Sequence, residues 1–144
     1  MKSQDVHASV TGEPLSADRL AQMVGRPAAG AVVTFEGRTR EVDQLEYEAY
    51  REMAEERIAA ILRASTERHR LEAAAAAHRI GTVPLGEASV IVAVSAAHRD
   101  EAFAGAREII DCIKAEAPIW KKEIDAGSER WVDGVRAGDG GVKA

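Results

Sequence analysis

At 144 residues, the chain is long enough to form one globular domain that buries roughly two-thirds of the surface of its unfolded form. Hydrophobic residues make up 46% and charged residues 30%, a composition that is typical of globular proteins and excludes a disordered or fibrous one. The net charge of −5 argues against general affinity for nucleic acid, because such binding needs many Lys and Arg side chains to neutralise phosphates.

Membrane insertion and disulfide chemistry are also disfavoured. No apolar run approaches the ~20 residues that a membrane helix needs, and residues 1–7 contain no apolar signal-peptide core, so a cytoplasmic protein is expected. Cys112 is the only cysteine, which excludes an intramolecular disulfide and a metal site built from several cysteines. Because its neighbour Asp111 is acidic, Cys112 is expected to pack rather than to act as a nucleophile.

The first elements are predicted to be a strand, a short helix and a second strand. Residues 5–11 indicate a strand, and Ser16 is predicted to cap a helix that Gly25 and Pro27 end. Residues 30–37 place β-branched and aromatic side chains between two glycines, which predicts a buried strand.

The middle of the chain is predicted to alternate between strands and one long helix. Residues 45–50 alternate as a strand with one solvent-exposed face does, and the helix over 53–65 places its apolar side chains on one side, at Ala54, Ile58, Ile61 and Leu62. The alanine run 73–77 suits a helix or a strand, and we favour a strand from its position. Residues 83–87 read as a turn and 88–95 as a strand buried on both faces.

The C-terminal part is predicted to contain a second long helix and two short strands. Asp100 is predicted to cap a helix over 101–116, and Pro118 should end it at or just before Ala117. Strands are expected at 118–124 and 128–133. We therefore predict an α+β domain over 1–133, mostly antiparallel with two long helices, followed by a flexible glycine-rich tail over 134–144.

Two lysines stand on either side of the predicted helix end. Alternation in the strand places Lys121 on the same face as Glu123. Lys114 falls at the edge of an apolar helical stripe formed by Ala102, Phe103, Ala106, Ile109, Ile110 and Ile113. A lysine at such an edge usually covers apolar surface with its stem, but its ammonium group can also reach into a cleft.

Cationic and aromatic side chains also gather at predicted element ends: Phe35 with Arg38 and Arg40, His98 with Arg99, Lys114 with Lys121, and Arg130 with Arg136. This pattern suits a small anionic ligand, since Arg offers a planar fork of donors and Lys can exchange protons. Taken singly, each arginine is better explained as a solvated surface charge, and His98 as a capping or packing residue. His78 could be a second histidine of the site, but no set of ligands has the spacing of a metal centre.

Five blocks of sequence, in consistent order, resemble the catalytic large subunit of molybdopterin synthase. The resemblance spans roughly residues 5–133, and its blocks are residues 30–40, 45–50 with 53–54, 78–81 with 86–87, 98–99 with 102–103, and 114–123. It implies an α/β-hammerhead-like fold and an enzyme that converts cyclic pyranopterin monophosphate (precursor Z) into molybdopterin, with no resident cofactor or metal.

The resemblance also implies the partners of the reaction. The sulfur would arrive as a thiocarboxylate on the C-terminal glycine of a small ubiquitin-like subunit, bound to a central homodimer within a heterotetramer. A lone cysteine with no evident sulfur relay agrees with an external sulfur donor.

The resemblance assigns roles by motif position. Lys114 and Lys121 would be catalytic, and substrate binding would involve Phe35, Arg40, His98, Arg99, Glu123 and Arg136, with His98 and Arg99 reaching the site across the dimer interface. Glu123 would orient Lys121. Our hypothesis is that the two amines, close enough to lower each other's basicity, shuttle protons while sulfur attacks the pterin side chain and the cyclic phosphate opens.

Two other functions compete with sulfur transfer. One is a non-catalytic module that binds the tail of a ubiquitin-like protein, and the other is a small-anion sensor that uses only the Arg and His clusters. Dependence of sulfur transfer on the chain separates the enzyme from both.

Overall fold

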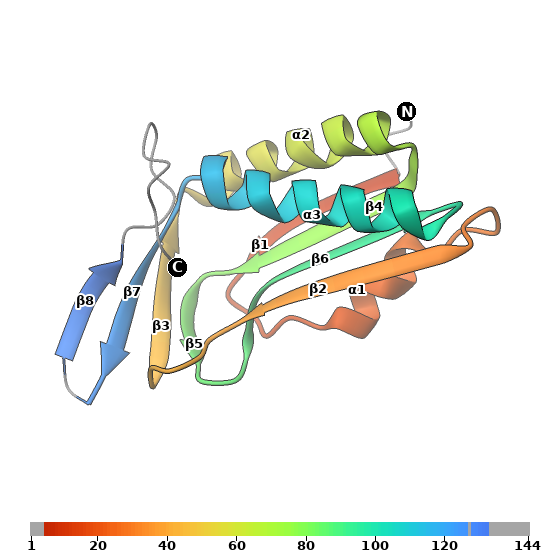
Figure 1. Ribbon diagram of the computed structural model, residues 1–144. Helices are drawn as coiled ribbons and strands as arrows, with labels where there is room; N and C mark the ends of the chain where they lie inside the picture. Colours follow the sequence, from red (N-terminus) through yellow and green to blue (C-terminus); the bar gives the residue numbers. More distant parts are fainter. Residues whose placement is uncertain (1–4, 127, 133–144) are drawn as a thin grey trace.

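The fold consists of two four-stranded sheets and three helices. A computed structural model describes residues 5–126 and 128–132 (Figure 1). The first sheet has the order β1-β4-β6-β2, from strands Val6–Thr11, Leu71–Arg79, Ala88–Ala96 and Ala31–Arg38. The second has the order β5-β3-β7-β8, from strands Gly81–Pro84, Gln44–Ala49, Ile119–Asp125 and Ser128–Val132. Only the β1–β4 pair is parallel among these described strands, so the predicted α+β, mostly antiparallel fold is confirmed.

The first sheet is covered by helices on both faces. Two long helices, α2 (Arg51–His69) and α3 (Arg99–Glu116), lie over one face, and the short α1 (Ala17–Val24) lies over the other (Figure 1). The buried face of α2 includes all four apolar positions predicted for it, with Ser65 and Thr66 added: Ala54, Ile58, Ile61 and Leu62 are each at most 6% exposed.

The alanine run forms the middle of β4, as predicted. Ala74 and Ala76 belong to the core under α2 and α3, whereas Ala73, Ala75 and Ala77 belong to the core under α1. Because both faces are buried, small side chains let a helical layer approach from either side. Gly105 of α3 serves the same close approach, since a Cβ there would lie 2.8 Å from Leu71 Cδ2.

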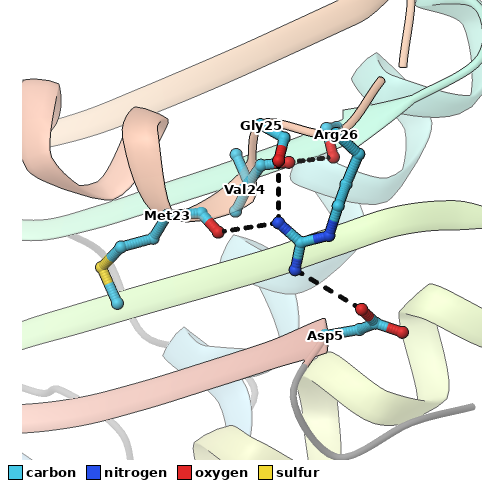
Figure 2. Close-up of polar contacts among 6 residues, drawn as sticks. Asp5, Met23, Val24, Gly25 and Arg26 are labelled. Carbon is cyan, nitrogen blue, oxygen red and sulfur yellow. Dashed lines mark hydrogen bonds and ion pairs between the residues drawn. The ribbon is translucent and has the colours of Figure 1, made fainter. Parts of the chain in front are cut away.

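Helix α1 is fixed at both ends by side chains. Ser16 is its N-cap, as predicted, and its Oγ accepts the Arg19 N–H at 3.2 Å. After the helix ends at Gly25, Arg26 Nη1 donates to Met23 O at 3.2 Å and to Gly25 O at 2.8 Å (Figure 2). Arg26 Nη2 also pairs with Asp5 Oδ1 at 3.4 Å, which ties the helix end to the start of β1.

Several local predictions are wrong. The strand at 30–37 is not buried, because β2 is an edge strand on which Val32 is 48% and Phe35 37% exposed. The predicted turn at 83–87 is confirmed only for residues 85–87, because Val83 and Pro84 belong to strand β5. Asp100 lies in the first turn of α3, whose N-cap is His98 without a side-chain cap bond, and Phe103 is 62% exposed although we placed it in the apolar stripe.

The two sheets meet where β4 and α3 end. Gly81 has φ of 84° and turns the chain from β4 into β5. On the neighbouring element, α3 stops at Glu116 and the chain enters β7 at Ile119. This junction carries the lysines singled out in the sequence.

Some predictions cannot be compared with the described residues. The tail 134–144, Arg136 within it and the last residue of the 128–133 strand all lie outside the ranges 5–126 and 128–132. Within those ranges, no helix has the length and apolar character required to cross a membrane.

Candidate functional site

Lys114 lies in the last turn of α3, with an exposed side chain. The helix ends where predicted: Ala117 is the C-cap, and its N–H donates to Ile113 O at 3.0 Å. Ile113 and the rest of the predicted stripe, except Phe103, are buried, so Lys114 stands at the edge of the buried face. The ammonium is therefore at the border between the core and the sheet junction.

Lys121 is half-buried in the middle of β7 and is the direct cross-strand neighbour of Tyr47 on β3. Burial lowers the pKa of its amine, and the positive charges of Lys114 and Arg40 lower it further, while Glu123 acts in the opposite direction. Since charges act this way only at short range in partly solvated surroundings, the structure brings Lys114, Lys121 and Arg40 to one place. We call these three residues the lysine recess.

Near Lys121 lie two buried rings to which the sequence analysis gave no role in substrate binding or catalysis. Tyr47 and His78 make an edge-to-face contact with centroids 4.8 Å apart. Burial lowers the pKa of His78 to about 4, the Arg79 carbonyl opposes this, and the charges of Lys114 and Lys121 add to it. Burial also raises the pKa of Tyr47, which a hydrogen bond with Ser89 partly offsets. Both rings are therefore uncharged near neutral pH.

Glu123 shares the strand face of Lys121, as predicted, but its carboxylate forms an ion pair with Arg130 on β8. The registers place Leu45 and Arg130 opposite Glu123 on either side. Glu123 thus acts on Lys121 through its charge, and its hydrogen-bonding capacity is directed to Arg130.

Arg40 follows β2 and remains largely exposed. Its Nη1 contacts Glu41 Oε2 at 2.6 Å, and both side chains are about three-quarters exposed. Glu41 has φ of 69°, a left-handed conformation that is uncommon for a non-glycine residue. Nearby, Thr39 is buried and its Oγ1 donates to Val83 O at 3.3 Å, which anchors the segment that carries Arg40.

Three other predicted residues, Phe35, His98 and Arg99, lie on other elements of the protomer. His98 and Arg99 begin α3, sixteen and fifteen residues before Lys114, which is roughly 24 Å along a helix for His98. His98 is exposed, with Nδ1 3.9 Å from Glu101 Oε1. Phe35 lies in the exposed edge strand β2. One protomer therefore does not bring the His98-Arg99 pair to the lysines.

Two other features stay apart from the recess. A cavity of about 420 Å³ lies beside β1 and α1, and its lining includes none of the predicted site residues. Burial and the charges of Glu116 and Glu108 raise the pKa of Cys112, which disfavours a thiolate. Among the described residues, no three or more His, Cys, Asp or Glu side chains gather as metal ligands.

Chemically, the recess suits an anionic ligand and proton exchange. In residues 5–126 and 128–132, neither Lys114 nor Lys121 has a carboxylate within ion-pair distance. Positive charge is therefore available to a phosphate or a carboxylate. The lowered pKa of Lys121 also makes its amine a better proton donor than an ordinary lysine and leaves more of it unprotonated to accept a proton.

Comparison with known proteins gives consistent matches. The family model described as MoaE protein matches residues 10–116. A molybdopterin synthase catalytic subunit from Oryza sativa is 54% identical over 110 residues, covering 72% of this chain and 57% of the rice protein. One from Thermoplasma volcanium is 42% identical over 134 residues, covering 88% of this chain and 98% of that protein.

The crystal structure of molybdopterin synthase from Staphylococcus aureus has a similar fold. The TM-score is 0.80 at 33% identity, and the match covers 91% of this chain and 97% of that chain. The rice relative is longer, so this chain spans little more than half of its length.

Proposed function

The chain belongs to the MoaE protein family, and from this premise we propose that it is the catalytic subunit of a molybdopterin synthase. In this proposal it transfers sulfur from the C-terminal thiocarboxylate of a small ubiquitin-like subunit to precursor Z, and so builds the dithiolene of molybdopterin. Each transfer exchanges the thiocarboxylate sulfur for an oxygen of water, so the small subunit leaves with an ordinary carboxylate. The proposal includes the cytoplasmic location expected from the sequence.

The observation that carries the proposal is the lysine recess. Its three cations have few local counter-charges: Arg40 contacts the exposed Glu41, and neither lysine has an ion-pair partner in the described part of the chain. A cyclic phosphate and a glycine carboxylate are both anions, and both would gain from such surroundings. The chain's relatives are named as catalytic subunits, which supports a second, separate subunit as the sulfur donor.

Lys121 is proposed to exchange protons and Arg40 to hold charge. The Lys121 amine has a lowered pKa, so it can take a proton from the attacking water and return it to the leaving oxygen. The planar guanidinium fork of Arg40 suits a phosphate. Displacement of Glu41 by the substrate would free the Arg40 fork for this contact. Lys114 adds positive charge from the other side.

His98 and Arg99 are proposed to complete the site of a second protomer. Both are exposed at the start of α3, too far along the helix to reach the lysines of their own chain. In a twofold dimer, each copy can supply to its partner what it cannot supply to itself. This supports the homodimer within a heterotetramer that the sequence resemblance implies.

Reconstitution tests the proposed function. The chain is mixed with a thiocarboxylated small subunit and precursor Z, and molybdopterin is quantified against a mixture without the chain. We expect product only when all three components are present. Binding of the small subunit without product would instead favour the non-catalytic tail-binding module, and binding of phosphate alone would favour the anion sensor.

A further inference from the structure

His78 is a buried titratable residue that the proposed mechanism does not use. It lies at the end of β4, in the row of side chains that contains Ala74 and Ala76, and it is only 7% exposed. Its cross-strand neighbours are Val10 and Val90, both buried apolar residues. Burying a polar ring among apolar side chains costs free energy unless its polar atoms are hydrogen-bonded.

The hydrogen bond of His78 fixes its tautomer. Nδ1 lies 2.9 Å from Arg79 O, and a carbonyl oxygen can only accept, so Nδ1 carries the proton. In the neutral ring Nε2 then carries the lone pair. The pKa of about 4 keeps the ring neutral at physiological pH. The side chain is thus an uncharged ring, held at one edge by the backbone.

Tyr47 connects this ring to Lys121. Tyr47 is the cross-strand neighbour of Lys121, so both side chains emerge on the same face of the second sheet. Its ring meets His78 edge to face at 4.8 Å and is 9% exposed. Ser89 holds the Tyr47 hydroxyl through a hydrogen bond, and Ser89 Oγ donates to Gly37 O at 3.3 Å. The two rings therefore form a fixed, poorly hydrated layer next to the half-buried amine.

We propose that His78 is a positioning residue for the lysine recess: pinned by Arg79 O and packed against Tyr47, its neutral ring forms the uncharged floor over which Lys121 is held. The use of this floor in catalysis rests on the proposed function. Its effect on Lys121 does not, because the floor is present in the isolated chain. A poorly hydrated floor disfavours the ammonium form of Lys121. His78 thereby sets how much of Lys121 is available as a free amine.

The charges around the floor are consistent with this role. A cationic imidazolium there would face two lysines, so neutrality of His78 is required for the recess to hold its charge. The titratable and charged groups linked to the floor, directly or through Lys121, lie on several elements and their flanks: Arg40, Tyr47, Arg79 with its partner Glu87, Lys114, Lys121, Glu123 and Arg130.

The test measures the titration of Lys121 in the full chain without any partner. Amines are acetylated briefly over a range of pH, and fragment ions resolve labelling at Lys121 from labelling at Lys122. Lys122 is an internal reference, because it lies on the opposite strand face and its pKa is raised by Glu129. The native chain should label Lys121 with a midpoint below the ordinary lysine value of 10.5.

Two substitutions separate the ring from its hydrogen bond. His78→Asn keeps a donor near Arg79 O but removes the ring, so water can enter and the Lys121 midpoint should rise toward the ordinary value. His78→Phe keeps an uncharged ring and should leave the midpoint low. His69→Asn is the matched control, because His69 contacts Glu108 between α2 and α3 and should not move the midpoint.

An unchanged Lys121 midpoint in His78→Asn, with a native circular dichroism spectrum, would overturn the proposal. So would a midpoint that rises equally in His78→Phe. If reconstituted sulfur transfer is also observed, the limb of its pH profile that follows Lys121 should move to higher pH in His78→Asn. If the native chain transfers no sulfur, the proposed function fails while the labelling result still decides the role of His78.

Discussion

Helix α3 contributes to two polar clusters. In one, opposite charges are paired, and in the other, like charges are gathered. In the middle of the helix, Glu108 accepts Ser65 Oγ at 2.6 Å and pairs with Arg68 Nη1 at 2.5 Å and His69 Nε2 at 3.1 Å. We call this cluster the α2–α3 clamp. In the last turn, Lys114 carries a positive charge that, like that of Arg40, acts on Lys121, and neither lysine has a carboxylate partner in residues 5–126 and 128–132.

The two clusters differ in whether their charges stabilise the fold or are available to a ligand. In the clamp, both carboxylate oxygens of Glu108 interact with side chains of α2, so the cluster holds the two helices together. In the recess, like charges are gathered, which costs stability unless an anion arrives. Substitutions in the clamp should therefore change stability without changing chemistry, and substitutions in the recess should do the reverse.

The largest expected effect is on sulfur transfer after Lys114→Ala. Lys114 is proposed to supply positive charge, and loss of a group that stabilises charge developing in the transition state typically lowers a rate by about 10²–10³-fold. Stability should not fall, because the substitution removes one cation from a positive cluster. Molybdopterin formation and thermal unfolding measured on the same preparation test both halves. A variant that loses stability and keeps its rate would place Lys114 with the clamp.

The second prediction concerns the distance between His98-Arg99 and the lysines. If the two ends of α3 serve different protomers, Lys121→Ala and Arg99→Ala chains are each inactive alone. Random mixing makes half of the dimers mixed, and each mixed dimer contains one intact site, so about a quarter of native activity should return. Mixtures that stay inactive after subunit exchange would mean that each chain uses its own Arg99.

The third prediction breaks the clamp. Glu108→Gln should lower the free energy of unfolding by about 1–3 kcal/mol, because it weakens charge-assisted bonds to Arg68 and His69. Sulfur transfer should remain native. Asp111→Asn is the control, since its exposed pair with Arg107 is worth about 0.5 kcal/mol or less. Denaturant titration measures both. Equal losses in the two variants would show that the clamp is no stronger than a surface pair.

The clamp should also depend on pH with a definite sign. Hydrogen bonds from Ser65 and Arg68, together with positive charge, lower the pKa of Glu108 below its ordinary value of 4.5. A carboxyl with a lowered folded-state pKa adds stability above its unfolded-state pKa and loses it as pH falls through the folded-state pKa. The stability difference between the native chain and Glu108→Gln should therefore be complete near pH 7 and shrink below about pH 4.5.

The smallest expected effect is a rise in melting temperature when an anion is added that can bind the lysine recess. Inorganic phosphate that binds the recess should raise the melting temperature by about 2–4 °C for each kcal/mol of binding free energy. The rise should be smaller in Arg40→Gln and unchanged in Arg107→Gln, which removes an exposed arginine of α3. Higher ionic strength should reduce it. An equal response in all three chains would indicate non-specific binding.

Local chemistry made much of the fold predictable from sequence. The alternation at 45–50 and the apolar positions of 53–65 are periodic signals that survive folding unchanged. Pro118 fixed the end of α3 because a proline forbids continuation. The order of strands has no such local signal, so the edge position of β2, and with it the exposure of Val32 and Phe35, was not predictable from the composition of that strand.

The candidate site also combines features that local sequence predicts with features that depend on how the sheets pack. Lys114 and Lys121 flank one helix end, so their proximity followed from local geometry, and Arg40 came from the family resemblance. Tyr47 and His78 meet through the docking of two sheets, which residue spacing does not encode. The available signal for His78 was weak: it is a polar residue that directly follows a run of alanines in a buried strand.

The central claim is that the lysine recess is where sulfur is transferred. The most direct measurement is single-turnover molybdopterin formation by Lys121→Ala beside Lys122→Ala, with thiocarboxylated small subunit in excess. The two lysines are adjacent in β7 and point to opposite faces, and Lys122 is engaged by Glu129 and the Trp131 ring. We predict loss of turnover in Lys121→Ala alone, whereas near-native turnover by that variant would contradict the account.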